Sequence, residues 1–299
     1  MTKVKYLSLL MTIHEARQQM IYSLKNIYED QEAMNVTDLA IEHITGRARI
    51  EQVKYKEILF PVDQIEKFNQ VIERLKQNEP IQYILGEAWF AGMQFHVDKT
   101  VLIPRPETEE LVSWIIKTLK GWQIPENRNY KALDIGTGSG CISIALRKQL
   151  PQFFEIWACD INDHVVNIAR KNADELQALV DFVALDFLDA AQRRQLPQVD
   201  VIVSNPPYIP LRDKYGMKPN VLDFEPHTAL FVPDNDPLVF YRAIAGFGKE
   251  KLYPGGLVFV EIHESSGKDT TELFRVEGYS VDLRKDMQGK DRMLKCSYS

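Results

Sequence analysis

Hydrophobic residues recur at helical spacing through the first 80 residues of the chain. One face of the first predicted helix consists of Ile13, Ala16, Met20, Leu24 and Ile27, which lie three or four positions apart. Thr12 and Glu15 form the pattern of a capping box at its start. A second helical stretch runs to about Thr45, where Gly46 is a stop signal, and a third is expected to open at Pro61. Residues 1–80 are therefore predicted to form a small all-helical N-terminal domain.

Between residues 81 and 105 the pattern changes to aromatic and β-type residues interrupted by glycine, which is typical of a β-hairpin. We expect this segment to be a β-hairpin connector. Trp89 and Phe90 are expected to pack within the hairpin rather than to contact a cofactor. The prolines at 104 and 106 then stiffen the chain, and helical spacing resumes over residues 107–120.

From residue 130 onward, short apolar segments alternate with helical ones. This alternation predicts a mostly parallel sheet with helices on both faces, in a domain covering residues 106–299. The loop joining the last two strand candidates contains no helical segment, so the final strand is expected to be antiparallel. The predicted strands are Ala132–Ile135, Glu155–Cys159, Val180–Leu185, Val201–Ser204, Leu257–Ile262, Ser280–Leu283 and Met293–Ser297.

Composition and charge narrow the possible functions. The 299 residues are 45% hydrophobic and 26% charged, with a net charge of −6, and residues 1–80 carry 11 basic and 12 acidic side chains. A basic nucleic-acid-binding arm is therefore not expected. No apolar run reaches the length of a membrane span, so no membrane association is expected.

The cysteines and histidines argue against metal sites and disulfides. The chain has three cysteines without a Cys-x-x-Cys pair, and its histidines show no metal-ligand spacing. The short apolar stretch near the N-terminus has no small-residue cleavage site after it. We therefore expect a cytoplasmic protein without a bound metal.

A glycine-rich loop follows the first predicted strand. Gly136-Thr137-Gly138-Ser139-Gly140 leads directly into a helix, and Asp160 closes the next strand. Glycines at such a turn let a ligand lie against the backbone, and the carboxylate can accept hydrogen bonds from ribose hydroxyls. Because the spacing is Gly-x-Gly-x-Gly, it differs from the dinucleotide fingerprint and resembles the cofactor loop of S-adenosylmethionine-dependent methyltransferases. The competing interpretations are a glycine turn without a ligand and, more remotely, a nicotinamide dehydrogenase.

Asp186 and Phe187 follow the third predicted strand, at the same edge of the sheet. The carboxylate can accept a hydrogen bond from an adenine amino group, and the aromatic ring can cover the face of the base. We expect both residues in the adenine region, although a phenylalanine taken alone at this position would more often belong to the core.

The segment Asn205-Pro206-Pro207-Tyr208 follows the fourth predicted strand. Two prolines stiffen the chain and remove two N–H donors, which leaves the side-chain oxygen of Asn205 and the carbonyl of Pro206 as acceptors. A planar NH₂ group can donate one hydrogen to each, with Tyr208 packed against its conjugated plane. This arrangement suits methylation of an amide or exocyclic amine, which requires orientation rather than a strong base.

Further motifs resemble the release factor glutamine methyltransferase family over nearly the whole chain. They are Glu79-Pro-Ile-Gln-Tyr-Ile-Leu-Gly86, Leu102-Ile-Pro-Arg-Pro-Glu-Thr-Glu109, Phe224-Glu-Pro-His-Thr-Ala-Leu230 and Gly289-Lys-Asp-Arg292. The resemblance implies a Rossmann-like class I methyltransferase sheet that uses S-adenosyl-L-methionine. The implied substrate is the glutamine side-chain amide in the Gly-Gly-Gln motif of class 1 peptide-chain release factors.

The resemblance also implies a role for each motif residue. The cofactor would be lined by Gly136, Thr137, Gly138, Ser139 and Gly140, with Asp160 at the ribose and Phe187 at the adenine. The substrate glutamine would be held by Asn205, Pro206, Pro207 and Tyr208, and docking of the release factor would fall to the N-terminal domain.

Some positions keep more than one interpretation. The chain reads Glu261-Ile262-His263 where many relatives have glycine after the acidic residue, which leaves the role of this edge open. Arg105 and Glu107 either close the pocket or anchor the connector. The main alternative function is methylation of a nucleic-acid amino group, against which the acidic charge and the lack of an inserted target-reading domain argue. A non-catalytic binding module is the other alternative.

Overall fold

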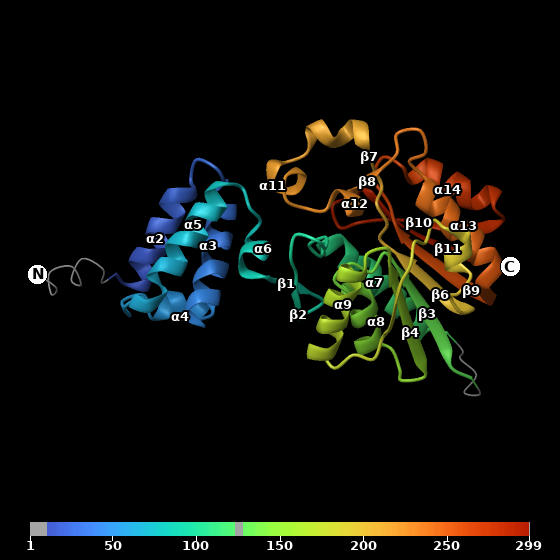
Figure 1. The fold of residues 1–299 in the computed structure, drawn as a ribbon, viewed down its shortest axis with the longest axis horizontal. Coiled ribbons are helices and arrows are strands. Elements are labelled where there is room, and N and C mark those ends of the chain that lie inside the picture. The colour runs from blue at the N-terminus through green and yellow to red at the C-terminus, as the bar shows by residue number, and fades with distance from the viewer. Residues whose placement is uncertain (1–10, 123–127, 299) are drawn as a thin grey trace, which may run out of the picture. The chain divides into compact units, whose positions relative to one another are not determined.

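A computed structural model describes residues 11–122 and 128–298, so the first ten residues of the predicted N-terminal domain lie outside the described part. The chain divides into two compact units. One contains the chain up to Gly86 together with Lys218–Phe224, and the other contains Glu87–Met217 and Glu225–Ser299. Figure 1 shows both units, with the chain coloured from the N-terminus to the C-terminus.

The first unit is helical, as predicted. Thr12 and Glu15 form the expected capping box, in which the Thr12 N–H donates to Glu15 Oε2 (2.7 Å) and the Glu15 N–H to Thr12 Oγ1 (3.2 Å). Gly46 ends the second helix in a left-handed conformation with φ of 68°. The helices are α2 (Ile13–Leu24), α3 (Asp30–Thr45), α4 (Arg49–Lys54), α5 (Ile65–Lys76) and α6 (Ile81–Leu85), with a 3₁₀ turn, η1 (Val62–Gln64), before α5.

Residues 81–85 differ from the prediction, because they form helix α6 rather than part of a hairpin. Pro80 precedes the first turn, and its carbonyl accepts hydrogen bonds from the backbone N–H groups of Tyr83 (3.0 Å) and Ile84 (3.1 Å). Ile81 and Tyr83 are buried. The β-type residues here therefore pack in a helical turn that ends at Gly86, and the hairpin begins one residue later.

The hairpin itself consists of β1 (Glu87–Phe90) and β2 (Met93–His96), which pair antiparallel. Phe90 is buried and its ring lies edge-on to that of Phe95, with centroids 6.2 Å apart. Trp89 is 61% exposed, because successive residues of a strand point to opposite faces. The expected packing is therefore confirmed for Phe90 and wrong for Trp89.

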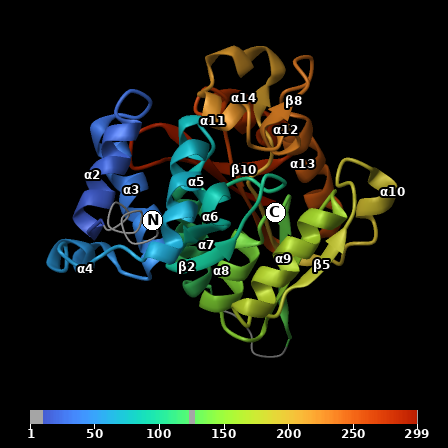
Figure 2. The same cartoon turned by 60° about the vertical axis from the view of Figure 1, so that its left-hand side comes forward.

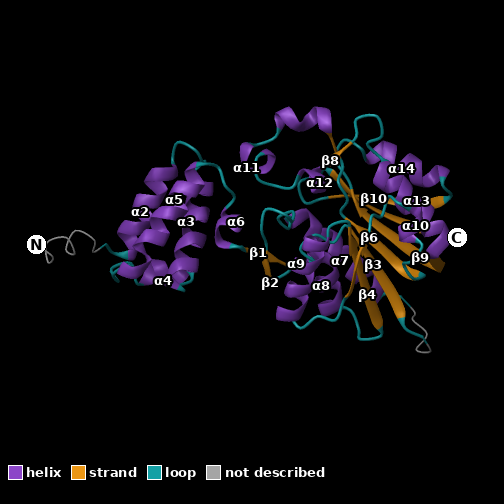
Figure 3. Ribbon diagram, viewed as in Figure 1, coloured by secondary structure: helices purple, strands orange, loops and turns teal. Residues whose placement is uncertain are grey.

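The second unit is built on a seven-stranded sheet, whose strands are drawn in orange in Figure 3. The strand order is β10-β11-β9-β6-β3-β4-β5. Neighbouring strands from β5 to β9 pair parallel, whereas β11 is antiparallel to both β9 and β10. This confirms the predicted sheet with an antiparallel last strand. The strands are β3 (Tyr130–Ile135), β4 (Phe154–Asp160), β5 (Asp181–Ala184), β6 (Val199–Ser204), β9 (Leu252–Glu261), β10 (Tyr279–Lys285) and β11 (Asp291–Tyr298).

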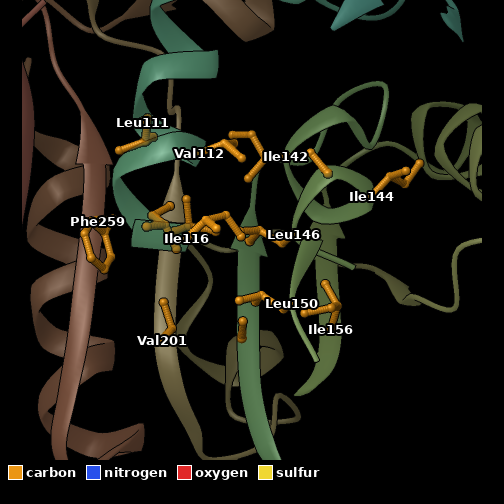
Figure 4. Close-up of a cluster of buried hydrophobic side chains, with 14 of the residues drawn as sticks. Leu111, Val112, Ile116, Ile142, Ile144, Leu146, Leu150, Ile156, Val201 and Phe259 are labelled. Atoms are coloured by element: carbon orange, nitrogen blue, oxygen red, sulfur yellow. The ribbon is translucent and has the colours of Figure 1, made fainter. Parts of the chain in front are cut away.

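Helices cover both faces of the sheet, and the strands alternate between two hydrophobic clusters. Val201 faces a cluster that includes α7 (Pro106–Lys120) and α8 (Cys141–Gln149), which Figure 4 shows in close-up. The next residue, Ile202, faces the other cluster with α13 (Val239–Lys251) and α14 (Gly267–Val276). Strands that are buried on both faces read as continuous apolar runs, which is why they were visible in the sequence. Figure 2 shows α9 (Asp163–Glu175) alongside β5.

The segment between β6 and β9 carries several short elements that the sequence pattern did not predict. They are β7 (Ile209–Pro210), η2 (Leu211–Gly216), α11 (Pro219–Leu222), α12 (His227–Leu230) and β8 (Phe231–Val232), with β7 and β8 paired in parallel. A further short helix, α10 (Ala190–Arg193), follows β5. None of the helices in the described ranges has the length and apolar character needed to cross a membrane.

Candidate functional site

The predicted site residues meet at one edge of the sheet, where four parallel strands end. The register pairs Ile135 of β3 with Cys159 of β4 and with Ser204 of β6, and it pairs Ser204 with Val260 of β9. Consequently the residues that follow these positions emerge together, which is where ligands bind in open α/β sheets. They are Gly136, Asp160, Asn205 and Glu261.

The glycine loop needs its glycines for backbone geometry. Gly136, Gly138 and Gly140 have φ of 73°, 54° and 82°, a region that residues with a side chain rarely adopt. A Cβ atom at Gly136 or Gly138 would meet no described atom within 4 Å, so open space adjoins the backbone there. At Gly140 it would lie 3.0 Å from Ile144 Cδ1. The first two glycines therefore leave room for a ligand, and the third allows close helix packing.

The side chains of the loop point into the protein. The Thr137 hydroxyl donates to Asp134 Oδ2 (2.6 Å), and the same oxygen accepts the backbone N–H of Ser143 (3.1 Å). Burial raises the pKa of Asp134 to about 6, against the lowering effect of these hydrogen bonds. Ser139 is also buried. Thr137 and Ser139 thus shape the loop, and their backbone is what remains for contact with a ligand.

Asp160 is half-buried at the end of β4 and is partly satisfied by the glycine loop. Its Oδ2 accepts the backbone N–H of Gly138 (3.0 Å), and its Oδ1 accepts that of Asn162 (3.4 Å). Burial raises the pKa of Asp160, and the two backbone bonds oppose that effect. Since each carboxylate oxygen has two acceptor positions, capacity remains for two hydroxyl donors. The position therefore suits a ribose.

Asp186 and Phe187 lie at the same edge, but most of the Phe187 ring belongs to the core. Phe187 is 5% exposed and packs on Phe247, with ring centroids 5.3 Å apart. Asp186 is half-buried, and its Oδ1 accepts the backbone N–H of Leu188 (2.8 Å). Phe187 therefore has little surface left for an adenine, whereas the second carboxylate oxygen of Asp186 makes no hydrogen bond within the described ranges.

Asn205 is held by a threonine that the sequence interpretation did not single out. Its Nδ2 donates to Thr108 Oγ1 (3.0 Å), and the Thr108 hydroxyl donates to Glu261 Oε2 (2.7 Å). Because the amide nitrogen faces Thr108, the Oδ1 of Asn205 is directed away from it as an acceptor. Pro206 is buried and Pro207 half-buried directly after it.

Glu261 connects the elements around Asn205, so the departure at Glu261-Ile262-His263 does not remove this edge from the site. Its Oε1 accepts the hydroxyl of Tyr208 (3.3 Å), and its backbone carbonyl accepts that of Tyr241 (2.9 Å). The carboxyl is 1% exposed, and burial raises its pKa to about 7. Burial and the neighbouring Glu261 likewise raise the pKa of Tyr208. The signal that could have identified Glu261 is an acidic residue at the end of a central apolar strand.

Arg105 anchors the connector, which is one of the two roles expected for it. Its guanidinium forms an ion pair with the carboxylate of Glu225, whose side chain is 1% exposed. The backbone N–H of Ile103 donates to the other oxygen of Glu225 (3.4 Å). Glu107, by contrast, is half-buried and acts on Glu261 through its charge, raising the pKa of that carboxyl.

Taken together, this edge of the sheet can hold a nucleoside-type ligand and an NH₂ group side by side. Within residues 11–122 and 128–298, no group of three or more His, Cys, Asp or Glu side chains is placed to hold a metal ion. All three cysteines are buried and free.

The chain matches two known domain families and several curated relatives. Residues 119–220 match the methyltransferase small domain, and residues 15–86 match the PrmC N-terminal domain. The release factor glutamine methyltransferase of Flavobacterium psychrophilum is 39% identical over 96% of this chain and 100% of its own length. That of Bacteroides thetaiotaomicron is 44% identical over 91% of this chain and 95% of its own.

One solved structure illustrates the likeness in fold. The hMettl16 catalytic domain, in complex with MAT2A 3′UTR hairpin 1, has a TM-score of 0.52 at 18% identity and covers 69% of this chain and 75% of that one. At this identity the likeness concerns the fold alone. On the strength of the two relatives that match over nearly their whole length, the chain belongs to the release factor glutamine methyltransferase family.

Proposed function

We propose that this enzyme methylates the side-chain amide nitrogen of the glutamine in the Gly-Gly-Gln motif of class 1 peptide-chain release factors. The observation that carries the proposal is the orientation of Asn205, whose Nδ2 is bonded to Thr108 and whose Oδ1 is left as an acceptor. An acceptor at this point suits a donor such as the NH₂ of a glutamine amide. The relatives that are 39% and 44% identical are release factor glutamine methyltransferases, which supports the same substrate class.

S-adenosyl-L-methionine is the proposed cofactor, and the residues present fit it. The glycine loop offers open space beside Gly136 and Gly138, and Asp160 has acceptor capacity for the ribose hydroxyls. Asp186 would accept from the adenine amino group, and Phe187, which is 5% exposed, would lie beneath that region. When bound, this cofactor supplies an electrophilic methyl group on a sulfonium.

The protein's contribution to the reaction is orientation. Asn205 Oδ1 and the carbonyl of Pro206 would each accept one hydrogen of the substrate NH₂, with Pro207 and Tyr208 confining its plane. Both acceptors are dipoles aimed at a nitrogen that becomes more positive as it is methylated, so they stabilise the developing charge. Fixing the nitrogen in line with the methyl group supplies the proximity effect.

No general base is required before transfer, because an amide nitrogen loses its proton readily once it is methylated and cationic. Glu261 has a pKa near neutrality, but it is buried and its oxygens accept from Thr108 and Tyr208. We therefore assign it no direct proton transfer with the substrate. The partner would be the release factor, without direct nucleic-acid contact, and the place of action the cytoplasm, where translation terminates.

The test is mass spectrometry of a class 1 release factor after incubation with the enzyme and S-adenosyl-L-methionine. We expect a gain of one methyl group on the glutamine of the Gly-Gly-Gln peptide. Adenine-containing DNA serves as the competing substrate, and label on DNA alone would overturn the proposal.

Two variants separate the roles of the site. Asn205→Ala is expected to abolish transfer and leave cofactor affinity nearly unchanged, because it removes a substrate acceptor. Asp160→Ala is expected to weaken cofactor binding measured by calorimetry, because it removes the ribose acceptor. An Asn205→Ala enzyme that kept most of its turnover would contradict the amide-holding role.

A further inference from the structure

A continuous chain of hydrogen bonds runs from the sheet to the amide of Asn205. It starts at the carboxylate of Glu261 on β9, passes through the hydroxyl of Thr108 on α7, and ends at Asn205 Nδ2, with donor–acceptor distances of 2.7 and 3.0 Å. Thr108 and Glu261 are 2% and 1% exposed, so water does not compete for these bonds. In the sequence, Asn205 lies 97 positions after Thr108, and Glu261 lies 153 positions after it.

The direction of each bond in this chain follows from the donors available. A threonine hydroxyl has one hydrogen, whereas an ionised carboxylate only accepts. The hydrogen of Thr108 is therefore committed to Glu261, and the lone pairs of its oxygen face Asn205. Only the NH₂ end of the Asn205 amide can bond to that oxygen, so the carbonyl end must point the other way.

We propose that Glu261 and Thr108 are positioning residues that set which end of the Asn205 amide faces the substrate. This inference rests on the proposed function, in which the substrate presents an NH₂ group. The two ends of an asparagine amide have nearly the same shape, and without a fixed partner the amide can rotate by 180°. In the rotated state an NH₂ group of Asn205 would face the NH₂ of the substrate, and two donors cannot bond to each other.

The charges around Glu261 set its pKa, and with it the pH range in which these hydrogen bonds are intact. Burial and the half-buried Glu107 raise the pKa of Glu261 to about 7, whereas Thr108, Arg292 and Tyr208 lower it. Arg292 is itself held by Asp286, with 3.0 Å between Nε and Oδ2.

Two further groups lie next to this cluster. The Tyr241 hydroxyl bonds the Glu261 backbone carbonyl, and the His263 ring lies 5.8 Å from that of Tyr208. Because a protonated Glu261 must donate one hydrogen, it can no longer accept from both Thr108 and Tyr208. Turnover should therefore rise with pH as Glu261 ionises.

The test uses a matched pair of substitutions at Thr108. Thr108→Val keeps the shape and removes the hydroxyl, and Thr108→Ser keeps the hydroxyl and removes a methyl group. With a release-factor substrate and S-adenosyl-L-methionine, we expect kcat to fall at least tenfold in Thr108→Val and less than threefold in Thr108→Ser. The affinity for S-adenosyl-L-methionine alone, measured by calorimetry, should stay within twofold in both, because neither change reaches the cofactor residues.

The pH profile of kcat provides a readout that a purely structural role would not move. We expect the wild-type and Thr108→Ser enzymes to show a rise in kcat centred near pH 7, and Thr108→Val to lose it. His263→Gln should keep the rise, because Glu261 remains. A wild-type profile without the rise, or a Thr108→Val enzyme with more than half the wild-type kcat, would overturn the positioning role.

These outcomes are distinguishable from failure of the proposed function. If the wild-type enzyme leaves release-factor glutamine unmethylated, the proposed function fails whatever the variants do. If the wild-type enzyme methylates glutamine but Thr108→Val and Thr108→Ser have the same kcat, the positioning role alone fails. Should Thr108→Val not fold, the wild-type pH profile together with Thr108→Ser still decides, since a missing rise or a large loss in Thr108→Ser contradicts the inference.

Discussion

The buried carboxyl of Glu261 should make the stability of the second unit depend on pH in a predictable direction. Replacing it by glutamine keeps the size of the side chain and removes the titration. Because burial raises the pKa of Glu261 in the folded protein, the folded state holds the proton more tightly than the unfolded chain. The stabilisation from this proton is fully present below the unfolded pKa and is lost as the pH rises through the folded pKa.

The magnitude follows from the two pKa values. A rise from 4.5 to about 7 corresponds to about 3.4 kcal/mol at roughly 1.36 kcal/mol per pKa unit. Integrating the linkage relation, about 2.5 kcal/mol of this falls between pH 5 and pH 8. The free energy of unfolding of Glu261→Gln, minus that of the wild type, should therefore increase by about 2.5 kcal/mol over this interval. Lost hydrogen bonds to Thr108 and Tyr208 change the level of this difference but not its slope.

Urea unfolding followed by tryptophan fluorescence measures this difference in the relevant unit. All four tryptophans, at positions 89, 114, 122 and 157, belong to the unit that contains Glu261. Asp134, whose pKa is raised to about 6, titrates in the same interval, but it is present in both proteins and cancels in the difference.

Glu155→Gln is the matched control. The pKa of Glu155 is lowered by its hydrogen bond from Asn129 and by Lys131, so its titration lies below the interval and the corresponding difference should be flat. A flat difference for Glu261→Gln as well would refute the reasoning, because it would mean that Glu261 has the same pKa in the folded and unfolded states.

Two stability predictions concern the elements that support the site. Gly140 and Gly289 have nearly equal φ of 82° and 81°, but a Cβ at Gly140 would lie 3.0 Å from Ile144 Cδ1, whereas at Gly289 it would meet no described atom within 4 Å. Gly140→Ala should therefore destabilise the unit by about 2 kcal/mol more than Gly289→Ala in urea unfolding, and equal losses would contradict the packing argument. Arg105→Ala should cost about 3 kcal/mol, because it leaves the buried carboxylate of Glu225 without its cation, and adding Glu225→Gln should restore part of that loss. If the double variant were no more stable than Arg105→Ala alone, the uncompensated charge would not be the cause.

The sheet could be predicted from sequence because its central strands, such as β6 and β3, are buried on both faces. Val201, Ile202 and Val203 alternate between the two hydrophobic clusters, so these three successive positions are all apolar. The antiparallel last strand followed from the loop before it, which is too short for a helix. The N-terminal helices were visible for a related reason, since their caps at Thr12 and Gly46 are local signals.

The elements that escaped prediction depend on tertiary contacts. The stretch Ile81–Leu85 has β-type residues, but Pro80 and the burial of Ile81 and Tyr83 favour a helical turn there. Trp89 looks like a packing residue by type, yet the alternation of the strand exposes it. The short elements between β6 and β9 lack enough residues to establish a period.

The two halves of the candidate site differ in the same way. The glycine loop is a local feature, because the conformations of Gly136 and Gly138 are needed wherever this strand turns into this helix. The direction of the Asn205 amide is not local, since it depends on Thr108 from α7 and Glu261 from β9. Asn205 and the prolines after it establish that two acceptors can exist here, but one of those acceptors could equally be a donor if the amide turned over. In our proposal, Glu261 fixes the Thr108 hydroxyl, and Thr108 in turn fixes the Asn205 amide with its oxygen toward the substrate. Selectivity for an NH₂ group therefore depends on a tertiary contact and not on the Asn-Pro-Pro-Tyr motif alone.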